Sequence, residues 1–251
     1  MMRIPLNIFV VGLTALLLFS GCGYYTGNTL ELPAYEKNEL VIAHKAYTLS
    51  YNEETEQAHW VAWELNTAEL NGAVKRSNKF RPDPNVTTGS ATDEDYYKSG
   101  FDRGHLAPAA DMAWDKEVMD ESFYYSNMSP QAASFNRGIW KRLESRTRQW
   151  AEKYQQVFVV TGPLYLQETK TIGPNRVAVP SHYYKGILVL NNDIQQAVGF
   201  IMPNKKSGND IYHYAVSIDS IEKASGLDLY PAIRNKYEKT IEASYDLSYW
   251  R

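Results

Sequence analysis

The segment SPQAASFNRGIWKRLESRTRQWAEKY, residues 129–154, constrains the fold more than any other part of the chain. Its apolar and aromatic residues recur at intervals of three to four positions, which predicts an amphipathic helix. These residues are Phe135, Ile139, Trp140, Leu143 and Trp150. Ser129 followed by Pro130 is typical of the start of a helix. The chain must therefore provide an apolar surface for a long helix.

Strand-like segments lie on both sides of this helix. Two of them, HKAYTLSYN and HWVAWEL, alternate well enough to predict a hairpin or a neighbouring pair. The predicted strands are residues 44–52, 59–65, 156–165, 176–190 and 196–204, with a further one at 211–219 before a helical pattern that begins at Ser220. Strands before and after one long helix predict an α+β sandwich.

Length and composition indicate one large domain. The chain has 251 residues, and from about residue 38 onward it shows no internal repeat, low-complexity tract or long linker, so we assign residues 41–251 to a single domain. Its nineteen tyrosines suit a fold that contains a sheet. The net charge of −3 excludes a global field that attracts polyanions, so any polyanion must bind to a local basic patch.

The first residues have the layout of a secretory signal. Arg3 precedes an apolar run from Ile8 to Phe19, which is too short to span a bilayer comfortably. The only cysteine, Cys22, follows directly, and the segment resembles a bacterial lipobox, which implies that Cys22 carries a lipid anchor. We predict a signal peptide at residues 1–21, a tether at 22–40, and an exported lipoprotein facing the periplasm or the cell exterior. A plain signal peptide with an unmodified cysteine is the alternative.

The stretch FDRGHLAPAADM, residues 101–112, concentrates chemistry in a few positions. His105, expected on a loop, is a candidate general base because a neutral imidazole accepts a proton near pH 7. Arg103 offers a planar fork of donors that suits phosphate oxygens. Gly104 lets the backbone approach a ligand closely, and Asp102 is expected to accept backbone donors in a turn. A charged surface turn is the competing interpretation.

Four residues of the predicted helix recur at every fourth position: Asn136, Trp140, Glu144 and Arg148. Such residues lie along one broad stripe. The oxygen ligands of Asn136 and Glu144 fit a hard divalent cation such as Mg²⁺. Eight residues correspond to roughly 12 Å along the axis, so we expect Asn136 to bind the ion directly and Glu144 to hold a metal-bound water. An exposed helix face with charge pairs is the alternative.

Basic residues gather in two places. Residues 137–153 contain six Lys and Arg against two Glu, a net charge of +4 on the predicted helix. Lys75, Arg76, Lys79 and Arg81 form a second cluster. Both clusters fit a phosphate backbone, although basic runs are more often solvated faces.

Together, DRGHLAP, SNMSPQ and N-x3-W-x3-E with an Arg four positions further on resemble the DNA/RNA non-specific endonucleases of the ββα-metal superfamily. The resemblance covers roughly residues 44–237. It implies a central antiparallel sheet flanked by helices, DNA and RNA as substrates, and Mg²⁺ as the cofactor, with Mn²⁺ as a substitute. The sequence does not determine the oligomeric state, and a homodimer is one of the states that it allows.

The resemblance also implies roles for individual residues. His105 matches the general base, Arg103 a phosphate contact, and Asn136 the direct metal ligand. Glu144 matches the carboxylate that orients metal-bound water, and Arg148 an arginine that stabilises charge on the phosphate. Asn127 matches a motif residue that supports His105 or the substrate.

An upstream arginine of the family is matched by Arg76 in RSNKFRPD, together with Phe80 and Asp83, and Arg81 is a rival for the same role. Some relatives carry an Asn where this chain has Phe123. The implied reaction is metal-assisted hydrolysis of phosphodiester bonds with little base specificity. The competing functions are a Ser/His/Asp hydrolase, for which no G-x-S-x-G element exists, and a non-catalytic nucleic-acid-binding surface lipoprotein.

Overall fold

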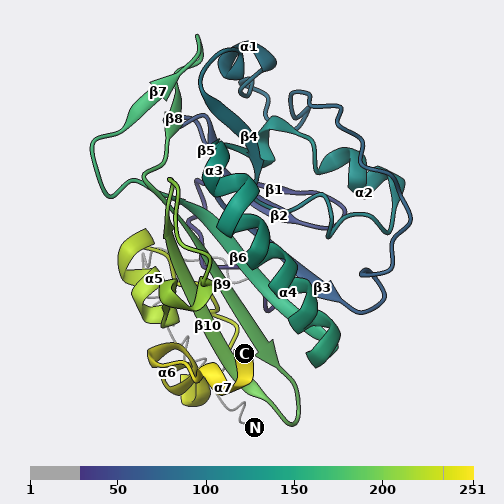
Figure 1. Ribbon diagram of the computed structural model, residues 1–251, viewed down its shortest axis with the longest axis vertical. Coiled ribbons are helices and arrows are strands. Elements are labelled where there is room, and N and C mark those ends of the chain that lie inside the picture. Colours follow the sequence, from purple (N-terminus) through teal and green to yellow (C-terminus); the bar gives the residue numbers. More distant parts are fainter. Residues whose placement is uncertain (1–28, 234) are drawn as a thin grey trace, which may run out of the picture.

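The computed structural model describes residues 29–233 and 235–251, and a seven-stranded antiparallel sheet lies at its centre (Figure 1). The strand order is β1-β2-β3-β6-β9-β10-β11. These strands are β1 Leu40–Ala43, β2 Thr48–Asn52, β3 Gln57–Asn66, β6 Gln156–Leu164, β9 His182–Leu190, β10 Gln195–Pro203 and β11 Ala215–Val216. Two small two-stranded sheets, β4–β5 and β7–β8, lie outside it. Their strands are β4 Phe101–His105, β5 Met128–Ala132, β7 Lys170–Ile172 and β8 Val177–Val179.

Both faces of the central sheet carry an apolar core. Along β6, Val157 and Val159 point into one core, whereas Phe158 and Val160 point into the other. This alternation follows from the two-residue period of a strand. Helix α4 (Lys141–Tyr154) covers the first core, and α5 (Ile218–Ser225) and α6 (Asn235–Ala243) cover the second (Figure 1). The predicted α+β fold with a central antiparallel sheet flanked by helices is confirmed.

A hairpin followed by a helix makes up the part of the fold that builds the site. Strands β4 and β5 pair antiparallel, with His105 opposite Met128. The chain then passes through a short helix, α3 (Ala133–Phe135), and a π-helical turn, η2 (Asn136–Trp140), into α4. In Figure 1 this hairpin lies at the upper end of α4. Two further short helices, α1 (Asp93–Tyr96) and α2 (Lys116–Glu121), belong to the segments around the hairpin.

The predicted start of the long helix is wrong. Ser129 and Pro130 belong to β5, and helical structure begins at Ala133. The Ser129 hydroxyl contacts Gln57 and lies 2.7 Å from the Tyr183 hydroxyl, and Tyr183 also donates to the Pro130 carbonyl at 2.9 Å. A Ser-Pro pair suits a helix start, but proline is equally tolerated in a strand of a two-stranded sheet, where no second neighbour needs its missing N–H.

Other predicted elements hold with changed bounds. The predicted hairpin is confirmed by the pairing of β2 with β3, and the sequence did not reveal β1. The strand predicted over residues 176–190 is interrupted at Pro180 and Ser181, giving β8 and β9. The strand predicted over 211–219 is wrong, because a 3-10 turn, η3 (Ile211–Tyr214), precedes a two-residue β11. Two helices at the C-terminal end complete the fold, α6 and α7 (Leu247–Trp250).

The predictions for the N-terminal segment fall mostly outside the described residues. The signal peptide, the lipobox and Cys22 all lie before Thr29. Within the predicted tether, Leu30, Leu32 and Tyr35 pack against the second core, and the Ala34 N–H donates to the Asp228 carbonyl at 2.8 Å. Residues 30–40 are therefore part of the folded unit and not a tether. None of the helices in the described part of the chain combines the length and apolar character needed to cross a membrane.

Candidate active site

A cleft of about 410 Å³ opens where the β4–β5 hairpin meets the start of α4. The side chains that share it come from three separate parts of the sequence. They are Arg76, Arg103, His105, Pro108, Ala109, Ala110, Asn136, Arg137, Lys141, Glu144 and Arg148. Six of the seven predicted site residues therefore line one cavity, and Asn127 is the exception.

His105 is the last residue of β4, so the expectation that it lies on a loop is wrong. Its side chain is 7% exposed, and its Nε2 atom is buried without a hydrogen-bond partner. The imidazole meets the Phe123 ring edge to face, with the ring centroids 4.8 Å apart. Burial, together with the charge of Arg76, lowers the pKa of His105 to about 3. The ring is consequently neutral and able to accept a proton.

Asn136 opens the π-helical turn, and Asp102 fixes the orientation of its side chain. The Asn136 Nδ2 group donates to Asp102 Oδ2 at 2.9 Å, which leaves Oδ1 free to serve as a ligand. Arg137 forms two further hydrogen bonds to the same carboxylate, at 2.8 and 2.6 Å. Although burial acts in the opposite direction, these hydrogen bonds lower the pKa of Asp102. Asp102 thus binds side chains of the helix and does not accept the backbone donors of a turn.

The π-helical turn breaks the regular stripe that the sequence predicted. Gly138 has non-helical dihedral angles (φ −104°, ψ −111°) between α3 and α4, and such turns often occur at functional sites. Asn136 and Glu144 reach the cleft from either side of this break. Trp140 does not, because its side chain is fully buried beside Phe135 and Tyr183.

The Glu144 carboxylate is influenced by a buried lysine. Lys185 of β9 has no exposed surface and no hydrogen-bond partner, and its Nζ lies 4.6 and 4.8 Å from the ring centroids of Trp63 and Trp140. Burial raises the pKa of the Glu144 carboxyl, and the nearby ammonium group of Lys185 opposes that rise. Burial also lowers the pKa of Lys185, against the pull of Glu144 and Asp111. The only carboxylate that lines the cleft is therefore influenced by a buried cation that does not line it.

Arg148 is held in place by Asp111. Its Nη1 donates to Asp111 Oδ1 at 2.9 Å, and its Nη2 donates to the Ser145 hydroxyl at 3.1 Å. Asp111 is 2% exposed and also accepts a hydrogen bond from the Trp63 indole at 3.2 Å. This buried carboxylate aims the guanidinium of Arg148 along the wall of the cleft.

Arg103 is fixed by different partners on the opposite side of the cleft. It forms an ion pair with Asp93 of α1, and its guanidinium carbon lies 4.1 Å from the centroid of the Phe80 ring. The Tyr125 hydroxyl donates to the same carboxylate. Arg103 therefore presents a planar cation to the cleft from a defined position.

Of the two candidate upstream arginines, Arg76 reaches the cleft. Its guanidinium lies 4.8 Å from the centroid of Phe123, the residue that also packs against His105. Arg81 lies over the Tyr124 ring at 4.4 Å and lines a different hollow beside α2. Phe123 thus forms a wall shared by His105 and Arg76.

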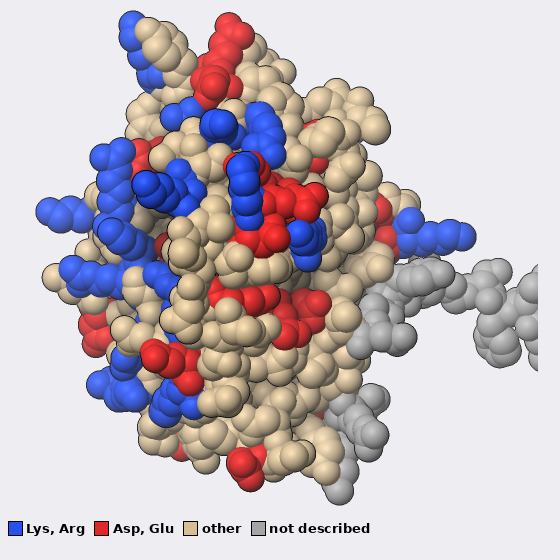
Figure 2. Space-filling model, turned by 90° about the vertical axis from the view of Figure 1, so that its right-hand side faces the viewer, with Lys and Arg blue, Asp and Glu red and all other residues tan. Residues whose placement is uncertain are grey.

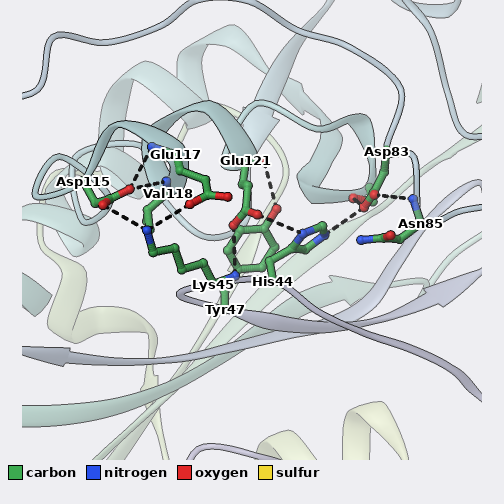
Figure 3. A network of polar contacts seen from close by, with 10 residues as sticks. His44, Lys45, Tyr47, Asp83, Asn85, Asp115, Glu117, Val118 and Glu121 are labelled. Carbon is green, nitrogen blue, oxygen red and sulfur yellow. Dashed lines mark hydrogen bonds and ion pairs between the residues drawn. The ribbon is translucent and has the colours of Figure 1, made fainter.

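Asp83 of the same segment is buried and has a structural role in a network of polar contacts (Figure 3). Its Oδ2 lies 2.9 Å from His44 Nε2 and accepts from the Ser126 hydroxyl at 2.5 Å, and its Oδ1 accepts from the Asn85 N–H at 2.9 Å. Although burial acts in the opposite direction, the hydrogen bonds from His44 and Ser126 lower the pKa of Asp83. The network ties the segment that carries Arg76 to the β1–β2 connection.

Asn127 supports the site through hydrogen bonds to the backbone near His105. It is fully buried, accepts from the Ala107 N–H at 2.9 Å, and donates to the carbonyls of Ala107 and Ser122 at 2.9 Å each. It therefore fixes the backbone two residues after His105, out of reach of a substrate. Gly104 also serves packing: an added Cβ would lie 2.2 Å from the buried Gln131 side chain, so the expectation that Gly104 admits a ligand is wrong.

Charge is distributed unevenly around the cleft. Five of its lining residues are cationic and one is a carboxylate. Figure 2 shows Lys and Arg gathered along one flank of the molecule, whereas acidic side chains are frequent toward the middle of the same view. A chain with a net negative charge thus carries the local basic patch that the sequence required.

Comparison with known proteins shows consistent similarity. The family model for DNA/RNA non-specific endonucleases matches residues 27–235. Mitochondrial nuclease EXOG of Danio rerio is 38% identical over 207 residues, which cover 76% of this chain and 60% of the relative. Mitochondrial endonuclease G of Bos taurus is 40% identical over 204 residues, covering 75% and 68%. The chain thus spans less than two thirds of some of these relatives.

A solved structure of an EndoG/EndoGI complex aligns with a TM-score of 0.75 and 35% identity, covering 79% of this chain and 89% of that one. The shared fold agrees with the hairpin-and-helix unit described above. The match of the family model over most of the chain settles its classification: the chain belongs to the DNA/RNA non-specific endonuclease family.

Proposed function

We propose that this chain is a metal-dependent endonuclease that hydrolyses phosphodiester bonds in both DNA and RNA. One observation carries the proposal: a neutral imidazole, an unpaired amide oxygen and a half-buried carboxylate share one cleft with five cationic side chains. The family supports the same activity. A binding module would need the cations alone, because a proton acceptor beside a candidate metal ligand adds little to binding.

The cations of the cleft suit a phosphate backbone. Arg76, Arg103 and Arg148 offer planar donors from three sides, and each is fixed by an aromatic ring or a carboxylate. Contacts to phosphate position a nucleic acid without reading its bases. We therefore expect little sequence preference and little discrimination between the two sugars.

His105 is proposed to take a proton from the attacking water. Because Nε2 is buried against aromatic rings, we assign the accepting role to Nδ1. A pKa of about 3 makes the free imidazole a weak base. A bound phosphate would offset the charge of Arg76, which is the smaller of the two influences that lower this pKa, and so would raise it in part.

Asn136 and Glu144 fit a single Mg²⁺, with Mn²⁺ as a substitute. Asp102 holds the amide nitrogen of Asn136 and leaves its oxygen free, and Glu144 adds a carboxylate whose raised pKa reflects burial without a direct cationic partner. Oxygen ligands of this kind are those that Mg²⁺ prefers. When bound, the ion would stabilise negative charge on the phosphate and on the leaving oxygen. Asn136 is the proposed direct ligand, and Glu144 acts through a water.

The test is cleavage of supercoiled plasmid and of single-stranded RNA by the purified protein with Mg²⁺, with and without a chelator. We expect nicking, linearisation and RNA degradation that stop when the chelator is added. A mobility shift of DNA without any cleavage would favour the competing function, a nucleic-acid-binding lipoprotein. Cleavage that persists in chelator would contradict the metal assignment.

We also propose that the protein is exported, that residues 1–21 are a signal peptide that is removed, and that Cys22 becomes the lipidated first residue of the mature protein. Support comes from the single cation, the apolar run and the lone cysteine of the N-terminal segment. The measurement is metabolic labelling with a radioactive fatty acid in a bacterial host. Label should be found in the parent and not in Cys22→Ala, and equal labelling of both would contradict the anchor.

A further inference from the structure

A cluster of three carboxylates lies on the face of the sheet opposite the cleft. It joins Asp219 and Glu222 of α5 to Glu242 of α6. One oxygen of each residue lies within 4.8 Å of the others. Helices α5 and α6 both pack on β10, so the cluster lies at the junction of two helices and the sheet.

Glu242 is the unusual member of this cluster. Its side chain is 4% exposed, and its Oε1 atom has no hydrogen-bond partner. A buried carboxylate oxygen is normally hydrogen-bonded or bound to a cation. Glu222 differs, since its Oε1 accepts from the Leu229 N–H at 2.8 Å. A buried carboxylate with an unpaired oxygen thus lies beside two further carboxylates.

The electrostatic surroundings contain more negative charge. Burial raises the pKa of Glu242 to about 9, with further contributions from Glu222, Glu238, Asp228 and Asp219. Burial likewise raises the pKa of Glu222 to about 7. Among the described residues, none of the ion pairs includes a member of this cluster. The repulsion can be relieved by protons or by a cation.

The geometry and the donor set favour a cation. Two oxygens that bind one Ca²⁺ at about 2.4 Å lie at most about 4.8 Å apart, and the three oxygens here lie within that limit of one another. All candidate ligands are oxygen atoms, and Ca²⁺ accepts several carboxylates in flexible geometry, whereas Mg²⁺ keeps most of its waters. Asp219 is exposed and provides access from solvent.

We propose that Asp219, Glu222 and Glu242 bind one Ca²⁺ ion, which fastens α6 to α5. The site is independent of the proposed nuclease cleft, because it lies on the other face of the sheet and shares no residue with it. Its role is to stabilise the layer formed by these helices.

The test counts bound ions by equilibrium dialysis of the purified protein against ⁴⁵Ca²⁺. The double substitution Glu222→Gln with Glu242→Gln is made in two backgrounds, the parent protein and Asn136→Ala. The Asn136→Ala background weakens the ion site proposed in the cleft. We expect the double substitution to remove one bound ion per chain in both backgrounds. The control, Glu152→Gln with Glu168→Gln, removes two carboxylates elsewhere and should keep the ion. Equal stoichiometry with and without the double substitution would overturn the proposal.

Thermal unfolding provides a second readout that does not depend on nuclease activity. The triple variant combines Asn136→Ala, Glu222→Gln and Glu242→Gln. Ca²⁺ should raise the Tm of Asn136→Ala and leave the Tm of the triple variant unchanged. Without Ca²⁺ at pH 8, the triple variant should unfold at a higher temperature than Asn136→Ala, because the cost of burying two carboxyl groups with raised pKa values has been removed, and this result also shows that it folds. If Ca²⁺ raises both Tm values equally, the ion acts elsewhere. A failure of DNA cleavage by the parent protein would refute the nuclease and leave this count intact.

Discussion

Lys185 is predicted to keep Glu144 ionised, and Lys185→Met tests this. Methionine fills a similar volume between Trp63 and Trp140, so the fold should survive the change. The ammonium group, however, is the largest opposing influence on the raised pKa of Glu144. Removing it leaves a half-buried carboxyl with less positive charge nearby, and the pKa of Glu144 should rise further.

The magnitude follows from Coulomb's law. Two charges about 6 Å apart at an effective dielectric constant of about 20 interact by about 3 kcal/mol, or about two pKa units, and this is an upper bound for Glu144 because its side chain is only half-buried. Because the proposed mechanism needs the carboxylate, a higher pKa means that it forms only at higher pH. The acidic limb of the pH profile should therefore move upward by one to two units, roughly.

The assay is initial-rate cleavage of a fluorogenic oligonucleotide between pH 5 and 9 at several Mg²⁺ concentrations. Lys185→Met should show the shifted acidic limb and should need more Mg²⁺ at pH 7 than the parent. Lys98→Met, which changes an exposed lysine, is the control and should match the parent. An unchanged limb in a Lys185→Met protein that is folded by circular dichroism would refute the reasoning.

Three further substitutions test how the cleft is supported. Gly104→Ala places a Cβ 2.2 Å from Gln131 and should cost about 1–3 kcal/mol, seen as a fall in Tm. Asp111→Asn removes the charge that holds Arg148 and should lower kcat about tenfold in the same cleavage assay; an unchanged kcat would show that Arg148 needs no anchor. Asn127→Ala leaves three buried backbone groups unpaired and should cost on the order of 3 kcal/mol in urea unfolding, and a loss below about 0.5 kcal/mol would contradict its structural role.

The sequence predicted the parts of the fold that depend on local periodicity. The alternation in β2 and β3 identifies two strands, and the three-to-four spacing of Leu143 and Trp150 identifies a helix, because both patterns are properties of a single element. The start of the helix was wrong because Ser129 and Pro130 are compatible with two local structures. Contacts with Gln57 and Tyr183, distant in sequence, decide between them.

The residues of the candidate site likewise fall into those that the sequence predicted and those that it did not. Residues in short motifs, such as His105 and Asn136, were found because each motif keeps its members together in sequence. Asp111 and Lys185 were missed, although each is a charged residue within an apolar setting and therefore a signal of a buried pair. What they contact could not be predicted, since Arg148 and the two tryptophan rings come from other elements.

The central claim is that His105 takes the proton from the attacking water, and single-turnover cleavage by His105→Ala tests it most directly. DNA binding should stay within about twofold of the parent, since the cations remain, while the cleavage rate should fall about 10²- to 10⁴-fold. His213→Ala, which alters an exposed histidine outside the cleft, should cleave normally. Cleavage by His105→Ala at the parental rate would contradict the account.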